Sequence, residues 1–158
     1  VQFFETDDLI YFPRFWPGSN DMIVFAHFHS DVYKTTFFLV ETGDSTSDEG
    51  FTLDGELIHY DISGVNESFA CLMLDGAKKR IDIVREDDEE GVTILEDSDM
   101  GNSVTYTLDG DYVLFSLQDA DKTWDLWAIS VEGGDPFKIT NFKYKSEIFP
   151  ITWNKDRK

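Results

Sequence analysis

The sequence predicts an all-β protein built of antiparallel strands. Helical periodicity is nearly absent, whereas short runs rich in β-branched and aromatic residues recur between clusters of Gly, Asp, Asn and Ser. The tetrapeptide Thr-Leu-Asp-Gly occurs twice, at residues 52–55 and 107–110, and residues 73–76 nearly repeat it. Such repetition is typical of a fold assembled from similar units.

Ten runs read as strands, in chain order: 22–28, 35–40, 56–62, 68–74, 80–84, 92–95, 104–108, 112–117, 124–131 and 137–140. Runs such as 22–26 and 112–115 are apolar without alternation, which indicates that both faces of the strand are buried. Antiparallel sheets stacked against neighbours on each side would produce that pattern.

The polar segment 42–50 is predicted to be a mobile loop. Its position creates a conflict in the spacing of the repeats. The interval from Gly43 to Gly55 is too short for two strands, so we expect one repeat unit to be irregular.

The most informative stretch is residues 125–141. Trp127, Ile129 and Val131 share one face of an extended segment, a Glu-Gly-Gly-Asp turn follows, and 137–140 begins a second strand. This hairpin resembles the inner-to-outer strand hairpin of the TolB-like (PD40, WD40-like) β-propeller repeat family. Residues 12–18 (Phe-Pro-Arg-Phe-Trp-Pro-Gly) resemble that family's Pro-x-Trp-Ser-Pro-Asp-Gly turn element.

The resemblance implies antiparallel four-stranded blades of a β-propeller, or an incomplete, open propeller-like array. At roughly 40 to 45 residues per blade, residues 1–158 would form a single all-β domain of about three blades plus the start of a fourth. We therefore expect either a fragment of a larger propeller or self-association that completes one. The resemblance also implies a periplasmic or extracellular location in the bacterial cell envelope.

The acidic composition restricts the partners. With 32 acidic and 13 basic residues, the net charge of −19 repels phosphate backbones and anionic membranes, so nucleic acid is not an expected partner. No apolar run approaches the roughly 18 residues of a membrane span. Cys71 is the single cysteine, which excludes an intramolecular disulfide.

His27, His29 and Asp31 form the sharpest candidate for chemistry, because alternate residues of an extended chain project from one face and could hold zinc. The spacing is similar to the His-x-His-x-Asp-His motif of metallo-β-lactamase-fold hydrolases, with Val32 in place of the last histidine. The alternative is that these residues occupy a turn between two strands.

Two acidic clusters, 86–90 and 96–102, could attract calcium, although the EF-hand spacing is not met. Both read more simply as solvated turns, so no cofactor is expected. There is no Gly-x-Ser-x-Gly, phosphate-binding loop or dinucleotide motif, and Cys71 lies in an apolar run, so covalent catalysis has no support.

Three functions remain. The first is a non-catalytic propeller module that binds a protein or peptide, basic in character, through acidic blade loops. The second is the propeller portion of a larger peptidase resembling the prolyl oligopeptidase or tricorn type. The third is a small metal-dependent hydrolase that uses the histidine cluster. The loop residues expected to bind the partner are Asp31, Asp44, Asp48, Glu49, Asp87, Asp88, Glu89, Glu90, Asp119 and Asp121.

Overall fold

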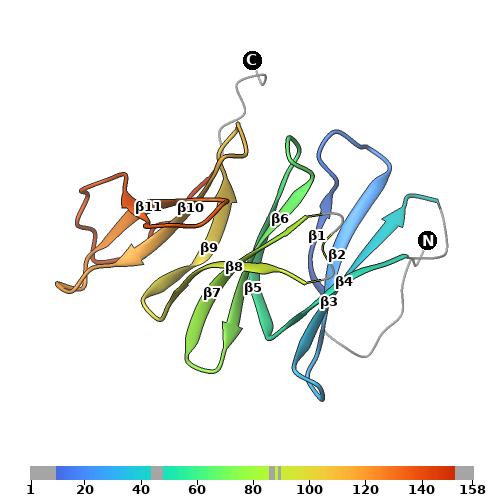
Figure 1. Cartoon of the computed structure of the whole chain (residues 1–158), viewed down its shortest axis with the longest axis horizontal. Helices are drawn as coiled ribbons and strands as arrows, with labels where there is room; N and C mark the ends of the chain where they lie inside the picture. Colours follow the sequence, from blue (N-terminus) through green and yellow to red (C-terminus); the bar gives the residue numbers. More distant parts are fainter. Residues whose placement is uncertain (1–9, 44–47, 86–87, 89, 152–158) are drawn as a thin grey trace.

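The computed structural model describes residues 10–43, 48–85, 88 and 90–151, which form three antiparallel four-stranded sheets side by side (Figure 1). In each sheet the strands lie in sequence order. Sheet 1 contains β1 (Ile10–Phe15), β2 (Met22–His29), β3 (Lys34–Glu41) and β4 (Asp48–Asp54). The prediction of an all-β fold is confirmed.

Sheet 2 lies in the middle and contains β5 (Glu56–Ser63), β6 (Ser68–Asp75), β7 (Lys78–Arg85) and β8 (Val92–Asp97) (Figure 1). Sheet 3 contains β9 (Met100–Tyr106), β10 (Tyr112–Gln118), β11 (Trp124–Ser130) and β12 (Phe137–Lys138). Among the described residues, none forms a helix with the length and apolarity needed to span a bilayer.

The prediction that 42–50 is a loop is wrong for Asp48, Glu49 and Gly50, which belong to β4. These residues pair with β3 in the register Phe38↔Glu49. The polar sequence forms a strand because main-chain hydrogen bonds need no apolar side chain, and an outer strand leaves its side chains in water. Residues 44–47 lie outside the described residues.

The expected irregular spacing has a simple origin at Gly55. This residue alone connects β4 to β5, so a single strand fills most of the interval from Gly43. Gly55 has φ +102°, and a Cβ there would lie 2.7 Å from the carbonyl oxygen of Leu74. Only glycine fits this one-residue connection between two sheets.

Sheet 2 is buried on both faces, as the apolar runs predict. Along β6, Phe69, Cys71 and Met73 belong to the core cluster shared with sheet 1. The alternate residues Ala70 and Leu72 belong to the cluster shared with sheet 3. All five are at most 3% exposed, so β6 has no solvent-facing side.

Phe37 lies at the centre of the core between sheets 1 and 2. Its fully buried ring contacts Phe51, Tyr60 and Phe69 at centroid distances of 4.5, 5.2 and 5.5 Å. The first contact is stacked and the other two are edge-to-face, the geometries that aromatic pairs prefer. This one side chain therefore couples two sheets.

Asp125 anchors the outer edge of sheet 3. Its side chain has no exposed surface and accepts hydrogen bonds from Lys138 Nζ (2.9 Å), Thr140 Oγ1 (2.9 Å) and the Phe142 N–H (2.5 Å). Burial alone would raise the pKa of Asp125, but these donors, Lys138 first, hold the pKa below its ordinary value. The carboxylate thus fixes the short β12 and the segment after it.

We expect Phe37→Ala to lower the free energy of unfolding by about 3 to 5 kcal/mol, because the loss of the ring leaves a cavity between two sheets. Phe15→Ala, at a ring that is 60% exposed, is the matched control and should change it by less than about 1 kcal/mol. Urea denaturation followed by circular dichroism measures both. Equal losses would contradict the placement of Phe37.

Asp125→Asn should destabilise the protein more than Asp135→Asn, because Asp125 is buried with three donors and Asp135 is exposed. The stability that Asp125 supplies is present at neutral pH and is lost as pH falls through its lowered pKa. Thermal unfolding at pH 7 compares the two variants. A loss for Asp135→Asn as large as for Asp125→Asn would show that the buried network contributes nothing special.

Candidate functional site

The connections between strands alternate between two ends of the sheets. One end, which we call the first end, carries the connections β1–β2, β3–β4, β5–β6, β7–β8, β9–β10 and β11–β12. The other connections lie at the second end. Neighbouring sheets are aligned, because Asn66 Nδ2 donates to the carbonyl oxygen of Gly110 (2.9 Å). Gly64 likewise lies against Pro17 of sheet 1. The β1–β2, β5–β6 and β9–β10 connections of the first end lie toward the top of Figure 1.

Acidic side chains dominate the first end. Among the described residues of its connections there is no lysine or arginine. The acidic residues there are Asp21, Glu67, Asp88, Glu90, Asp109, Asp111, Glu132 and Asp135. All are exposed except the half-buried Asp88. The single basic residue next to these connections is Arg85, the last residue of β7.

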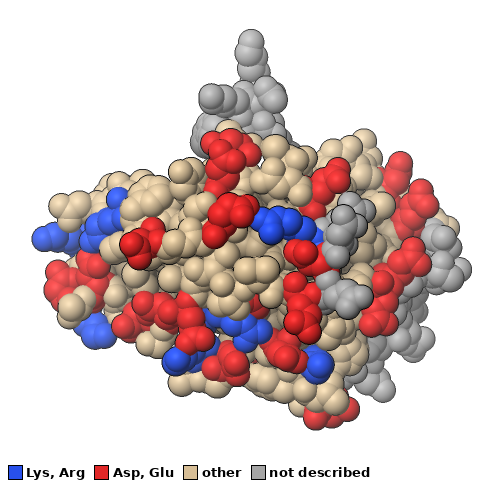
Figure 2. Space-filling view, viewed as in Figure 1, with Lys and Arg blue, Asp and Glu red and all other residues tan. Residues whose placement is uncertain are grey.

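The second end carries both signs of charge. Its described connections contain Asp31, Asp99, Asp119, Asp121 and Lys122. The segment after β12, bridged to the start of β11 through Trp124↔Tyr144, adds Lys143, Lys145 and Glu147. On the face shown in Figure 2, most basic side chains lie toward the lower part and the left, with one group nearer the middle, while acidic ones are spread throughout. The net negative charge is therefore strongest at the first end.

The predicted loop residues divide between the two ends. Asp88 and Glu90 lie at the first end, and Asp48 and Glu49 lie in β4 next to it. Asp31, Asp119 and Asp121 lie at the second end, so these residues cannot form one surface together. Asp44, Asp87 and Glu89 lie outside the described residues.

Of the acidic residues at the first end, the sequence pattern identifies only Asp88 and Glu90 as binding candidates. Two others, Asp109 and Asp135, belong to the Leu-Asp-Gly and Gly-Gly-Asp turn signals that were used only to find the repeats. Asp109 also has a turn role: hydrogen bonds from the Thr107 hydroxyl (2.5 Å) and the Asp111 N–H (3.2 Å) lower its pKa. Turn chemistry therefore supplies part of the acidity.

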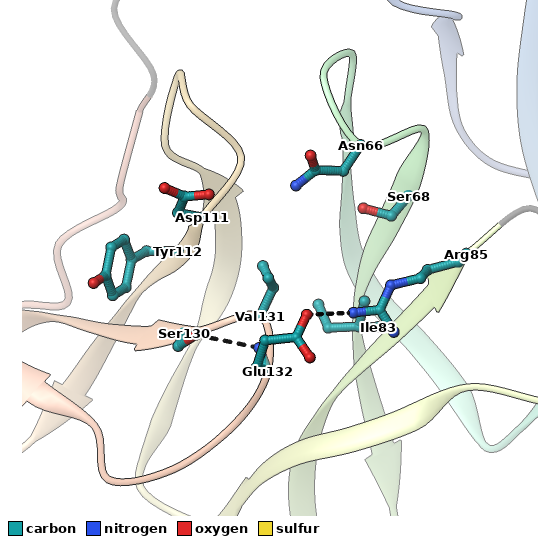
Figure 3. A pocket seen from close by; sticks show the side chains of 9 residues that line it. All are labelled: Asn66, Ser68, Ile83, Arg85, Asp111, Tyr112, Ser130, Val131 and Glu132. Atoms are coloured by element: carbon teal, nitrogen blue, oxygen red, sulfur yellow. Dashed lines mark hydrogen bonds and ion pairs between the residues drawn. The ribbon is translucent and has the colours of Figure 1, made fainter.

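A pocket of about 560 Å³ opens at the first end between sheets 2 and 3 (Figure 3). Arg85 Nη2 crosses this seam and pairs with Glu132 Oε1 at 2.7 Å. Ile83 and Val131 form the apolar part of the lining, and the carboxylate of Asp111 stands at the opposite side (Figure 3). In this pocket the chain itself supplies the cation, Arg85, that pairs with an acidic residue of the β11–β12 connection.

A second pocket, of about 360 Å³, opens between sheets 1 and 2 at the same end. It is lined by aromatic and aliphatic side chains with two carboxylates: Trp16, Met22, Leu39, Gly50, Phe51, Glu67, Phe69 and Asp88. None of these lining residues is basic. The two pockets thus lie at the same end, each between neighbouring sheets, but differ in the charge of their lining residues.

The inner strands carry a polar network. Asp61 accepts hydrogen bonds from Arg14 Nη1 (3.0 Å), Thr105 Oγ1 (2.8 Å) and the Tyr106 N–H (2.8 Å), which links β1, β5 and β9. His59 Nε2 lies 3.0 Å from Arg14 Nη2. Burial lowers the pKa of His59 from its usual 6.5, and the Arg14 guanidinium lowers it further.

The predicted zinc residues lie at the second end of sheet 1. His27 and His29 belong to β2, with ring centroids 4.1 Å apart, and Asp31 follows in the turn. Within the part of the chain that the structure describes, no three His, Cys, Asp or Glu side chains are gathered as a metal site requires.

Comparison with solved structures identifies the architecture. TolB from Acinetobacter baumannii is 14% identical to this chain, with a TM-score of 0.67. The alignment covers 87% of this chain and 34% of the TolB chain. An uncharacterized protein from Listeria monocytogenes EGD-e is 13% identical, with a TM-score of 0.72. The alignment covers 97% of this chain and 45% of the Listeria protein. The chain has the fold of TolB-like β-propeller blades. Sheets 1 to 3 are therefore three blades, and the predicted architecture is confirmed.

The β-propeller domain of the trilobed protease from Pyrococcus furiosus shares the blade architecture, at 13% identity and a TM-score of 0.57, with 85% of this chain and 44% of that chain covered. The chain thus spans less than half the length of these three proteins or domains. No protein-family model and no curated protein matches the sequence.

We expect His59 to make the propeller less stable below neutral pH. The unfolded chain takes up a proton on His59 near pH 6.5, whereas the folded chain does so only at lower pH, so unfolding is favoured as pH falls through this window. His59→Asn removes the effect. Urea unfolding at several pH values between about 7.5 and 5 should give a smaller pH-dependent loss for His59→Asn than for the unmodified protein. Identical pH profiles for the variant and the unmodified protein would contradict the role given to His59.

Proposed function

We propose that this chain is a non-catalytic propeller module that binds a basic protein or peptide through the acidic connections at its first end. One observation carries the proposal: the described connections there contain eight acidic residues and no basic one, whereas the second end carries both signs. A mixed end has a weak net field. An end of one sign attracts a partner of the opposite sign over distances of about a Debye length.

The scaffold suits such a role. The buried cores between the sheets hold the connections in fixed relative positions, so partner binding requires little ordering of the backbone. Loops presented by a rigid framework are a common basis for recognition. The negative field also disfavours nucleic acid as the partner.

A location outside the cytoplasm, in the periplasm or at the cell envelope of a bacterium, is part of the proposal. It rests on the resemblance of the repeats to TolB-like propellers and on the TolB structure of similar fold. Fractionation of the native source followed by immunoblotting tests it. Recovery of the protein in the cytoplasmic fraction alone would count against it.

The electrostatic account predicts salt-sensitive binding. The dissociation constant for an arginine- and lysine-rich peptide of about ten residues should rise at least about fivefold between about 50 and 300 mM NaCl, because screening weakens exposed charge pairs. Fluorescence anisotropy of the labelled peptide measures this. Binding that is insensitive to salt would contradict the role given to charge.

The matched variants locate the surface. Glu67→Gln with Asp135→Asn removes two charges from the first end, and Asp31→Asn with Asp99→Asn removes two from the second. All four side chains are exposed and belong to neither core cluster. Only the first pair should weaken binding. Equal weakening would point to the net charge of the whole chain rather than to one end.

A second candidate is the propeller portion of a larger peptidase. The similarity to the trilobed protease propeller favours it, as does that to an acylaminoacyl peptidase, at 13% identity and a TM-score of 0.58 with 85% of this chain and 26% of that chain covered. In either case we propose that residues 149–151 begin a fourth blade, since they line a cavity with Arg14, His59 and Asp61 of the inner strands.

Native mass spectrometry separates the remaining alternatives. A dimer or larger assembly would support completion of the ring by self-association. The zinc prediction at His27, His29 and Asp31 requires bound zinc that a chelator removes and that His29→Ala abolishes. The peptidase candidate requires a natural polypeptide substantially longer than 158 residues, which immunoblotting of the native source measures.

A further inference from the structure

We propose that the pocket between sheets 1 and 2 at the first end binds an arginine side chain of the partner. This inference rests on the proposed function and specifies the contact through which a basic segment is anchored. It is drawn from the two walls of the pocket, from the contrast with the seam between sheets 2 and 3, and from the charge around its mouth.

The wall contributed by sheet 1 is apolar and aromatic. Trp16 follows β1, Leu39 belongs to β3 and Phe51 to β4, and all three are half-buried. The Trp16 ring makes an edge-to-face contact with Phe69 of sheet 2, which also lines the pocket, at 5.6 Å between centroids. The pocket therefore presents a tryptophan whose position is fixed by the core but whose surface is still accessible.

The wall contributed by sheet 2 combines the ring of Phe69 with two carboxylates. Glu67 in the β5–β6 connection is exposed and Asp88 in the β7–β8 connection is half-buried. The carboxylate of Asp88 is oriented by the N–H of Arg85, which donates to Oδ2 at 3.1 Å. A planar cation that enters the pocket would thus meet aromatic surface and carboxylates at the same time.

The neighbouring seam shows what is missing here. Between sheets 2 and 3, Arg85 lines the pocket and pairs with Glu132 across the seam. Between sheets 1 and 2 the lining contains two carboxylates and no lysine or arginine. The described connections around the mouth provide none either. Charge complementarity therefore identifies a cation supplied by the partner as the occupant.

Arginine fits these walls better than a small cation. Its methylene groups can pack against Leu39 and Phe51, while the guanidinium stacks on an indole ring and donates to a carboxylate at the same time. Lysine offers the same charge without the planar stacking surface. A pocket of about 360 Å³ is large enough for one such side chain.

The test uses two peptides, acetyl-Gly-Gly-Arg-Gly-Gly-amide and the same sequence with uncharged citrulline in place of arginine. Each is titrated into the ¹⁵N-labelled protein at low salt, and the indole N–H resonance of Trp16 is followed by NMR. Trp16→Phe assigns that resonance by its disappearance. We expect the arginine peptide to shift the Trp16 resonance saturably, and the citrulline peptide to bind at least about fivefold more weakly.

Matched substitutions make the result specific. Glu67→Gln should weaken binding of the arginine peptide about three- to fivefold, whereas Asp31→Asn, which removes an exposed carboxylate of the second end, should change its affinity less than twofold. Both variants should keep the melting temperature of the unmodified protein. Equal effects of the two variants would overturn the assignment to this pocket.

The outcome separates the two proposals. If the longer basic peptide binds with salt dependence but the Trp16 resonance does not move with the arginine peptide, the acidic end binds cations and this pocket is not the anchor. If neither the longer basic peptide nor the arginine peptide binds at any salt concentration, both proposals are wrong. A Trp16 shift of equal size and affinity with citrulline would show that the pocket recognises an apolar stem and not a charge.

Discussion

The structure depends on the burial of sheet 2 from both sides. A strand such as β6, with Phe69 and Met73 on one face and Leu72 on the other, has no favourable state in which either face meets water. Sheets 1 and 3 must therefore stay in place for sheet 2 to be stable. The alignment of the three sheets, and with it the grouping of connections at each end, follows from that requirement.

Much of the architecture could be predicted because the apolar runs are long and unambiguous. The run around β2 and the one around β10 read as strands without any partner in view. By contrast, β4 begins with Asp48-Glu49-Gly50, whose hydrogen bonds to β3 depend on main-chain groups that a hydropathy pattern does not report. The same limit applies to β12, which is only two residues long and is held by Asp125.

The candidate site was less predictable, for a physical reason. The acidic turns are visible in the sequence, but the end at which each turn lies depends on counting every strand, and the omission of β4 from the predicted runs puts that count out of step. The seam pocket is harder still, because Trp16 and Glu67 face one cavity while lying far apart in the chain. One sequence gives no information on such a pairing.

The one-residue connection at Gly55 has a consequence for how such a module can diversify. The space at this link is so restricted that even a Cβ would collide with the Leu74 carbonyl. A longer link would therefore have to displace sheet 1 from sheet 2 and disrupt their shared core. The connections at the opposite end are longer and, apart from Trp16 and Val131, contribute nothing to the core clusters, so insertions and deletions can accumulate there at little cost to the scaffold. Relatives of this chain should therefore keep the length of one rim constant and vary the other, so that new specificities arise on an unchanged framework.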